Sequence, residues 1–356
     1  VSTTAHNNTA VGHASLTENT TGANNVGVGN SALYNNTTAN YNTAIGYLAL
    51  FNANSGGTGG YSNTAVGSNS LYALTTGVHS VAVGVNALDA CTTGNNNTAV
   101  GYEALTAQTT GSNATALGWK ALTANTTGNN TAVGSQALFT VTTGNNNTAM
   151  GIGALQVSTA DNNTAYGHNA MTANTTGNQN VAMGGFALDA NTASNNTAVG
   201  KHALVANTTG AGNVAVGGFA LDANTTANYN TALGYQSLSA NTAGANNTAC
   251  GMNALTTNTG GDDNVAVGYQ ALYVNTTGDH NIAIGRNSLV ANTIGTDNAA
   301  IGRSALGANT TGSYNVALGD QALYSNTTGE KNTALGAYSL YTNSTASQNT
   351  AVGYYC

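Results

Sequence analysis

Acidic side chains gather at one place in the chain, at Asp262, Asp263, Asp279 and Asp297. Carboxylate oxygens bind hard cations such as Ca²⁺, and a suitably spaced pair of carboxylates can cleave a glycosidic bond. Asp262 and Asp279 would approach one another, at about 4.8 Å, only if the chain retraces its path every 17 residues. The alternative is a solvated acidic turn edge, which we favour because no cleft is indicated. We therefore predict no catalytic, cofactor-binding or metal-binding residues.

The histidines and cysteines lie too far apart in the sequence to form a metal cluster or a nucleophilic site. The histidines fall in variable turn positions: His6, His13, His79, His168, His202 and His280. Three cysteines are too few for a disulfide framework, so we expect unpaired thiols. Cys250 occupies a position that is Val, Leu or Ile elsewhere and is expected to be buried. We expect Cys91 to be exposed in a turn, and Cys356 at the end of the chain to be able to cross-link neighbours. The chain is not predicted to be an enzyme.

The whole chain is built from one short repeat. A glycine, called here the anchor glycine, recurs 21 times between Gly12 and Gly353, at intervals of 17 residues except for three of 16 and one of 21. The long interval contains an insert at Ser55–Gly60. A fixed short period indicates a solenoid, so we predict a single continuous solenoid over residues 1–356 with no separate catalytic domain.

Each unit has the same order of residue types. Before the anchor glycine stand a strand asparagine (Ser80 and Ala114 are exceptions), a Thr or β-branched residue, a strand alanine (Gly27 in the second unit) and an aliphatic position. This is a short β-strand pattern. After the glycine come two variable residues, Ala or Ser, and Leu. Two further variable residues and a turn of the type Asn-Thr-Thr-Gly follow. We predict an all-β, parallel β-solenoid of about 21 coils, each with two short strands, forming a rod on the order of 100 Å long.

Side chains alternate across a strand, so the strand asparagine and alanine share one face while the Thr and aliphatic positions share the other. We expect the aliphatic residue and the Leu to fill the coil interior, and the alanine row to form a flat face that packs against a sister chain. Stacked asparagines are expected to hydrogen-bond along the axis. Proline is absent from the chain, as expected where most strands are central.

The amino-acid composition limits the classes of partner that the chain could bind. Five basic and 12 acidic residues give a net charge of −7, which does not suit nucleic acid. No apolar run is long enough to span a membrane. The chain begins with Val1, so a processed or partial product is expected, and ends that break off within a repeat favour end-to-end stacking. Asn-Thr-Thr triplets such as those at Asn207, Asn275 and Asn326 match the glycosylation pattern, a match we interpret as accidental.

Aromatic residues form two stripes. One follows the anchor glycine directly (Tyr47, Tyr102, Trp119, Tyr235 and Tyr269), and the other follows the Leu (Tyr34, Phe51, Tyr72, Phe139, Tyr273, Tyr324 and Tyr341). Such stripes can pack in a subunit seam or stack on sugars. We favour the seam and keep cell-surface glycans as the alternative.

The units resemble two groups of fibrous proteins. Asn264–Gly268 and Asn281–Gly285 are similar to coils in the heads of trimeric autotransporter adhesins. Gly268–Tyr273 and Asp320–Gly329 more closely resemble repeat arrays of bacterial and phage tail-fibre-like proteins, which often precede an endosialidase-type intramolecular chaperone domain. The resemblance implies a left-handed β-roll, a homotrimeric fibre and an extracellular, cell-surface or virion location.

Three functions remain open at this stage. The first is a structural fibre or filament shaft with an adhesin-like surface role, built by trimerisation or end-to-end polymerisation. The second is an ice-binding protein that uses threonine rows, although the strand Thr position is often Val or Ile. The third is a fibre that binds or degrades polysaccharide, which would need an acidic cleft that 17-residue coils leave little room to build.

Overall fold

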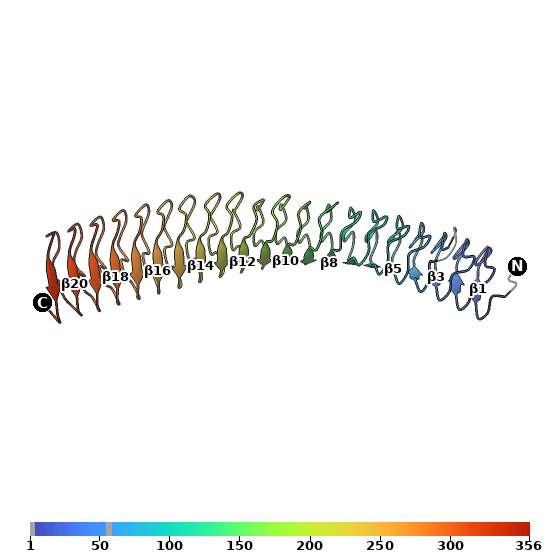
Figure 1. Ribbon diagram of the computed structural model, residues 1–356, viewed down its shortest axis with the longest axis horizontal. Helices are drawn as coiled ribbons and strands as arrows, with labels where there is room; N and C mark the ends of the chain where they lie inside the picture. The colour runs from blue at the N-terminus through green and yellow to red at the C-terminus, as the bar shows by residue number, and fades with distance from the viewer. Residues whose placement is uncertain (1–3, 55–58) are drawn as a thin grey trace. The chain divides into compact units, whose positions relative to one another are not determined.

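The computed structural model describes residues 4–54 and 59–356, and these contain β-strands and turns but no helix. The chain divides into two compact units, residues 1–178 and residues 179–356. Each is a parallel β-solenoid in which successive strands lie side by side (Figure 1). The predicted fold class and the 17-residue period are therefore confirmed. Residues 55–58 of the predicted insert lie outside the described part of the chain.

The first unit contains ten three-residue strands. They are β1 (Thr9–Val11), β2 (Val26–Val28), β3 (Thr43–Ile45), β4 (Thr64–Val66), β5 (Val81–Val83), β6 (Thr98–Val100), β7 (Thr115–Leu117), β8 (Thr131–Val133), β9 (Thr148–Met150) and β10 (Thr164–Tyr166). Each strand pairs in parallel with the next, and equivalent positions face one another.

The second unit contains eleven strands of the same length. They are β11 (Val181–Met183), β12 (Thr197–Val199), β13 (Val214–Val216), β14 (Thr231–Leu233), β15 (Thr248–Cys250), β16 (Val265–Val267), β17 (Ile282–Ile284), β18 (Ala299–Ile301), β19 (Val316–Leu318), β20 (Thr333–Leu335) and β21 (Thr350–Val352). Their register is again position on position: Val265 pairs with Ile282 and Val267 with Ile284.

The strand turns the opposite face inward from the predicted one, whereas the Leu row is buried as predicted. The strand alanines are buried, whereas the aliphatic position is partly or largely exposed: Ala283 has no exposed surface, and Ile284 is 38% exposed. The alternation of faces is as predicted, but the alanine face is the one that points inward. Space explains this choice. A side chain added at Gly27, in the alanine position, would place its Cβ 2.6 Å from Ser15 Oγ and 3.4 Å from Leu16 Cγ, so the opposite wall leaves room for little more than a methyl group.

The wall opposite the strand is a succession of turns, so the predicted second strand is wrong. Ala271 and Leu272 are consecutive and both fully buried, which a strand with alternating side chains does not allow. The backbone achieves it with left-handed angles at Gln270 (φ 54°) and Leu272 (φ 52°). This wall still bonds along the axis, since Leu272 N–H donates to the Ser288 carbonyl at 3.0 Å.

Two rows of asparagines hold successive coils together through hydrogen bonds along the axis, as predicted, but both rows are buried, which was not predicted. In the first row, the strand asparagine binds the next coil: Asn264 Oδ1 accepts from Asn281 N at 2.9 Å, and Asn264 Nδ2 donates to the Gly278 carbonyl at 2.8 Å. In the second row, the turn asparagine of the Asn-Thr-Thr motif donates to its equivalent in the preceding coil. These bonds measure 2.7–3.2 Å from Asn207 to Asn343 in the second unit.

One irregular coil shows how the two rows compensate for each other. Ala114 lacks the amide of a strand asparagine, and the same coil carries Gln108 in place of the turn asparagine. The longer Gln108 side chain donates to Asn97 Oδ1 at 3.0 Å and accepts from Asn125 Nδ2. The fully buried Gln108 therefore supplies side-chain hydrogen bonds between the coils next to Ala114, where the strand asparagine is missing.

The anchor glycine is required by both conformation and space. Gly268 has φ 130°, and a Cβ added there would lie 2.8 Å from the carbonyl carbon and oxygen of Gly285 in the next coil. Such a backbone angle strongly disfavours other residues. The recurrence of glycine thus sets the close spacing of the coils.

Two of the cysteine predictions are wrong. Cys91 replaces a turn asparagine, and because that row points inward its thiol is fully buried, where desolvation raises its pKa to about 11. Cys250 lies in the outward-facing aliphatic position and is therefore partly exposed. Cys356 is exposed, and all three described cysteines are free, as expected.

Candidate interaction surface

The outer face of each strand carries three parallel rows of side chains, here called the sheet-face stripe. The rows are the Thr or β-branched position, the aliphatic position, and the residue directly after the anchor glycine. In the coil of β17, for example, they are Ile282, Ile284 and Arg286, of which Ile282 is 41% exposed. The strand turns these side chains outward because the alanine and asparagine between them point into the coil.

The aliphatic row is large and apolar in both units. Members with more than a third of their surface exposed are Val11, Ile45, Val83, Leu117 and Met150 in the first unit, and Met183, Leu233, Ile284, Ile301, Leu318 and Val352 in the second. The exposed aliphatic side chains of successive coils lie side by side, because equivalent strand positions pair in register. Contiguous exposed apolar surface of this kind often marks an interaction site.

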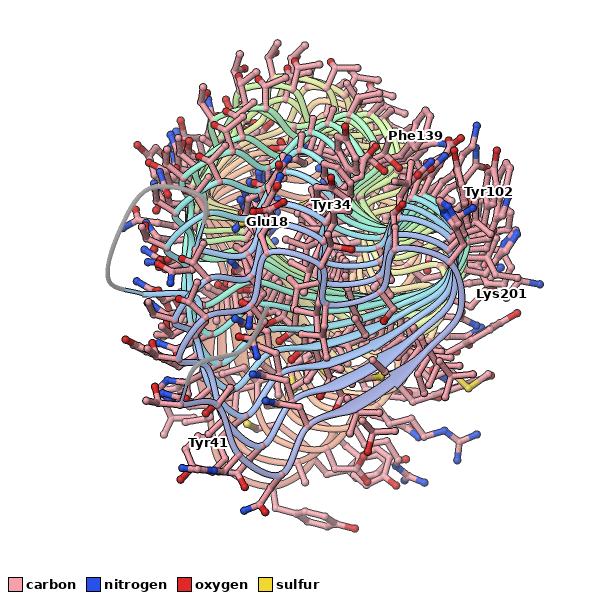
Figure 2. All side chains as sticks on the ribbon, turned by 90° about the vertical axis from the view of Figure 1, so that its right-hand side faces the viewer. Glu18, Tyr34, Tyr41, Tyr102, Phe139 and Lys201 are labelled. Atoms are coloured by element: carbon pink, nitrogen blue, oxygen red, sulfur yellow. The ribbon has the colours of Figure 1, made fainter. Side chains whose placement is uncertain are left out.

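The aromatic residues that follow the anchor glycine belong to this stripe. Tyr47, Tyr102, Trp119, Tyr235 and Tyr269 are 40–54% exposed, and Figure 2 shows Tyr102 pointing away from the coils. Several of these rings contact cations: Lys120 Nζ lies 5.0 Å from the Trp119 ring and Arg286 lies 5.8 Å from that of Tyr269. The first predicted aromatic stripe therefore forms a margin of the sheet face.

Two pairs of opposite charge lie near the stripe. Arg303 donates to both carboxylate oxygens of Asp320, at 2.9 and 2.8 Å, and this bond lowers the pKa of Asp320 and raises that of Arg303. Lys120 lies 3.4 Å from Glu103. A hydrogen bond from Tyr102 is the main reason that the pKa of Glu103 is lowered. All of these groups are solvent-exposed, so the pairs add little stability.

Five of the seven aromatic residues that follow the Leu stack along the axis. Tyr34, Phe51 and Tyr72 stack in successive coils, with ring centroids 5.2 and 5.5 Å apart. Tyr324 and Tyr341 stack in the same way at 5.5 Å. Neighbouring coils thus stack equivalent rings on one another. The stacking covers the ring faces on which a sugar would have to pack.

A second aromatic cluster was missed from the sequence. His202 lies between Phe186 and Phe219, with ring centroids 5.4 and 5.2 Å away, and Tyr235 adjoins Phe219 at 6.1 Å. His202 was predicted only to occupy a variable turn position, and the structure places its ring between two phenylalanines. The signal was available, because three of these residues occupy the second position after successive anchor glycines.

The acidic group is a turn edge with a structural role. Asp262 accepts a hydrogen bond from Ala245 N at 2.7 Å, and Asp279 accepts one from Asp262 N at 2.8 Å. His280 lies between Asp263 and Asp297, with N–O distances of 3.8 and 3.7 Å. Across the described residues, no three His, Cys, Asp or Glu side chains are arranged to hold a metal ion.

The asparagines of the Asn-Thr-Thr triplets named above point into the solenoid. Asn207, Asn275 and Asn326 have no exposed surface, and their amides bond within the turn asparagine row. Within residues 4–54 and 59–356, no helix has the length and apolar character needed to cross a membrane.

Comparison with known proteins does not identify relatives. A scan with protein-family models finds none that matches the chain, and a search of curated proteins finds no significant similarity.

Proposed function

We propose that the chain is a rigid structural shaft that associates laterally with copies of itself through the sheet-face stripe. The observation that supports this most directly is the outward-facing aliphatic row, which continues from coil to coil in each unit with few charges. Contiguous exposed apolar surface on a folded chain often marks a site of protein–protein association. A homotrimeric fibre at the cell surface or in a phage virion is the form that the sequence resemblance favours.

This proposal moves the contact from the alanine row to the aliphatic row. The alanines are enclosed within their own chain and cannot touch a neighbour. Cell-surface glycans remain the proposed external partners, contacted by the exposed rings along the margin of the stripe. The role is mechanical and adhesive and requires no catalytic group.

The test is to place charge on the stripe. We expect the native chain to sediment as a trimer, and the triple variant Val267→Lys, Ile284→Lys, Ile301→Lys to sediment as a monomer with an unchanged β circular dichroism spectrum. Lysine at Thr277, an exposed turn residue of the same coils, is the matched control and should leave the mass unchanged. A native chain that stays monomeric at high micromolar concentration would refute lateral association.

Ice binding is the second candidate, and one observation favours it. Five successive coils carry an outward threonine: Thr98, Thr115, Thr131, Thr148 and Thr164. Among the described residues their hydroxyls make no hydrogen bonds to the protein, so they form a regular row of hydroxyls beside the aliphatic row. Thermal hysteresis of the purified protein, lost in a Thr131→Lys variant, would support this function over the structural one.

A further inference from the structure

A row of stacked rings in the first unit stops abruptly at an acidic residue. Tyr34, Phe51 and Tyr72 occupy the fifth position after successive anchor glycines, and their planes lie within 16° and 17° of parallel. Figure 2 labels Tyr34, the first ring of the row. The next coil has Asp89 in this position. The short carboxylate cannot cover the outer face of Tyr72 as a fourth ring would.

A cavity of about 280 Å³ lies where the row breaks off. Tyr72 and Asp89 form two of its sides, and Leu48 and Asn69 line the others. Leu48 and Asn69 come from the second position after the anchor glycine in two successive coils, so the cavity is built from fixed parts of the stack. Its volume suits a small flat group rather than a single water molecule, whose share of the liquid is about 30 Å³.

One carboxylate oxygen in this cavity lacks a partner. Asp89 Oδ1 is buried and accepts no hydrogen bond from the described residues. Burial raises the pKa of Asp89, opposed by hydrogen bonds from its own N–H and that of Ala90, while the negative charge of Glu103 raises it further. A buried carboxylate oxygen without a donor is unfavourable, and a cation bonded to Asp89 Oδ1 would remove that penalty.

We propose that this cavity binds a guanidinium group, which stacks on Tyr72 as the fourth member of the row and donates N–H bonds to Asp89 Oδ1. Ring face and carboxylate both attract positive charge. A planar cation fits better than an ammonium because it can lie flat on the ring and donate two hydrogen bonds at once. The source is an arginine side chain of a partner protein or a free guanidine compound, and the chemistry recognised is the same.

The chain provides matched controls. Asp189 and Asp222 occupy the equivalent position in the second unit, but the residues at this position in the preceding coils are Thr172 and Val205 rather than aromatic residues. Asp222 Oδ1 is buried without a hydrogen-bond partner, as Asp89 Oδ1 is, whereas neither Asp189 carboxylate oxygen is. Asp222 therefore tests whether a carboxylate oxygen without a donor is sufficient in this position without the ring beneath it.

The experiment is a titration of the full chain with L-argininamide and, separately, L-lysinamide, followed by calorimetry and by the NMR shifts of the Tyr72 ring. We expect argininamide to bind at least tenfold more tightly than lysinamide. Asp89→Asn and Tyr72→Leu should each weaken binding at least tenfold, whereas Asp222→Asn should not change it, because no ring lies at this position in the coil before Asp222. A short arginine-containing peptide that binds more tightly than argininamide would indicate a protein partner, and equal affinity would indicate a free guanidine compound.

Three results would overturn the proposal. The first is the absence of binding at millimolar argininamide, and the second is an Asp89→Asn variant that binds as well as the native chain. The third is a shift of the Tyr72 resonances by a neutral methyl glycoside but not by argininamide, which would show that the cavity accepts a sugar. Circular dichroism of both variants excludes unfolding as the cause of a loss.

Discussion

Replacing Asn264 with alanine should weaken the stack at a single rung. Its side chain is fully buried and supplies the acceptor for Asn281 N–H and the donor for the Gly278 carbonyl. Alanine would leave both backbone groups unsatisfied at about 1–3 kcal/mol each, so the local free energy of opening should fall by about 2–6 kcal/mol. Since about 1.4 kcal/mol corresponds to a factor of ten, hydrogen exchange nearby should accelerate by at least about 30-fold.

The reporter is the amide of Ile282, which keeps its own bond to the Asn298 carbonyl at 2.8 Å in the variant. Exchange measured residue by residue is preferable to a melting curve, because a solenoid can open locally. Serine at position 264 should have a smaller effect, since Ser80 in the equivalent position accepts from Asn97 N at 3.3 Å. Thr277→Ala is the surface control. If Ile282 exchanges at the native rate in Asn264→Ala, the asparagine row does not hold the coils together.

Three further outcomes follow from burial, backbone angle and charge. Gly268→Ala should destabilise the second unit by at least about 2 kcal/mol in denaturant unfolding, whereas Gly260→Ala, whose added Cβ meets no atom within 4 Å, should change stability little. A thiol reagent at pH 8 should label Cys356 within minutes and leave Cys91 unreacted until the protein unfolds, because burial raises the pKa of Cys91 to about 11; equal labelling rates would contradict its inward placement. Burial raises the pKa of Asp89 above its unfolded value of about 3.9. Folding therefore takes up protons at this carboxyl group, and the free energy of unfolding should fall as pH rises above about 3.9. Asp89→Asn should therefore raise the melting temperature at pH 7, and the gain should vanish below pH ~3.9.

The period and the strand positions could be predicted because every coil repeats them. The choice of interior could not be made from hydrophobicity alone. Val267 is the larger apolar residue, but Ala266 shares its face with the strand asparagine, whose amide must reach backbone groups inside the stack. Read together, these two positions identify the buried face. The hydrogen bonds that the buried asparagine makes to backbone groups stabilise this face inward more than burial of the valine would stabilise the other face.

The second wall and the cysteines depend on geometry that residue types do not show. Ala271 and Leu272 were assigned to a strand, but two adjacent inward side chains require left-handed backbone angles that leucine seldom adopts. Cys91 occupies the position of an asparagine that was interpreted as a solvent-facing turn residue. Only the inward direction of the turn asparagine row makes that thiol inaccessible. Likewise, the cavity at Asp89 depends on which side chains neighbour it in adjacent coils.

The repetition of contacts also bears on how such a chain can change length. Equivalent strand positions of successive coils pair with one another, so deleting or duplicating 17 residues joins surfaces that already match. Changes of a single residue are tolerated at exposed positions of a turn. The 16-residue coil that begins at Gly184 omits one threonine of its turn and keeps the buried residues Leu188 and Asn191 in place. Recombination between copies within a gene would therefore yield folded proteins of different reach, and natural variants should differ by whole coils.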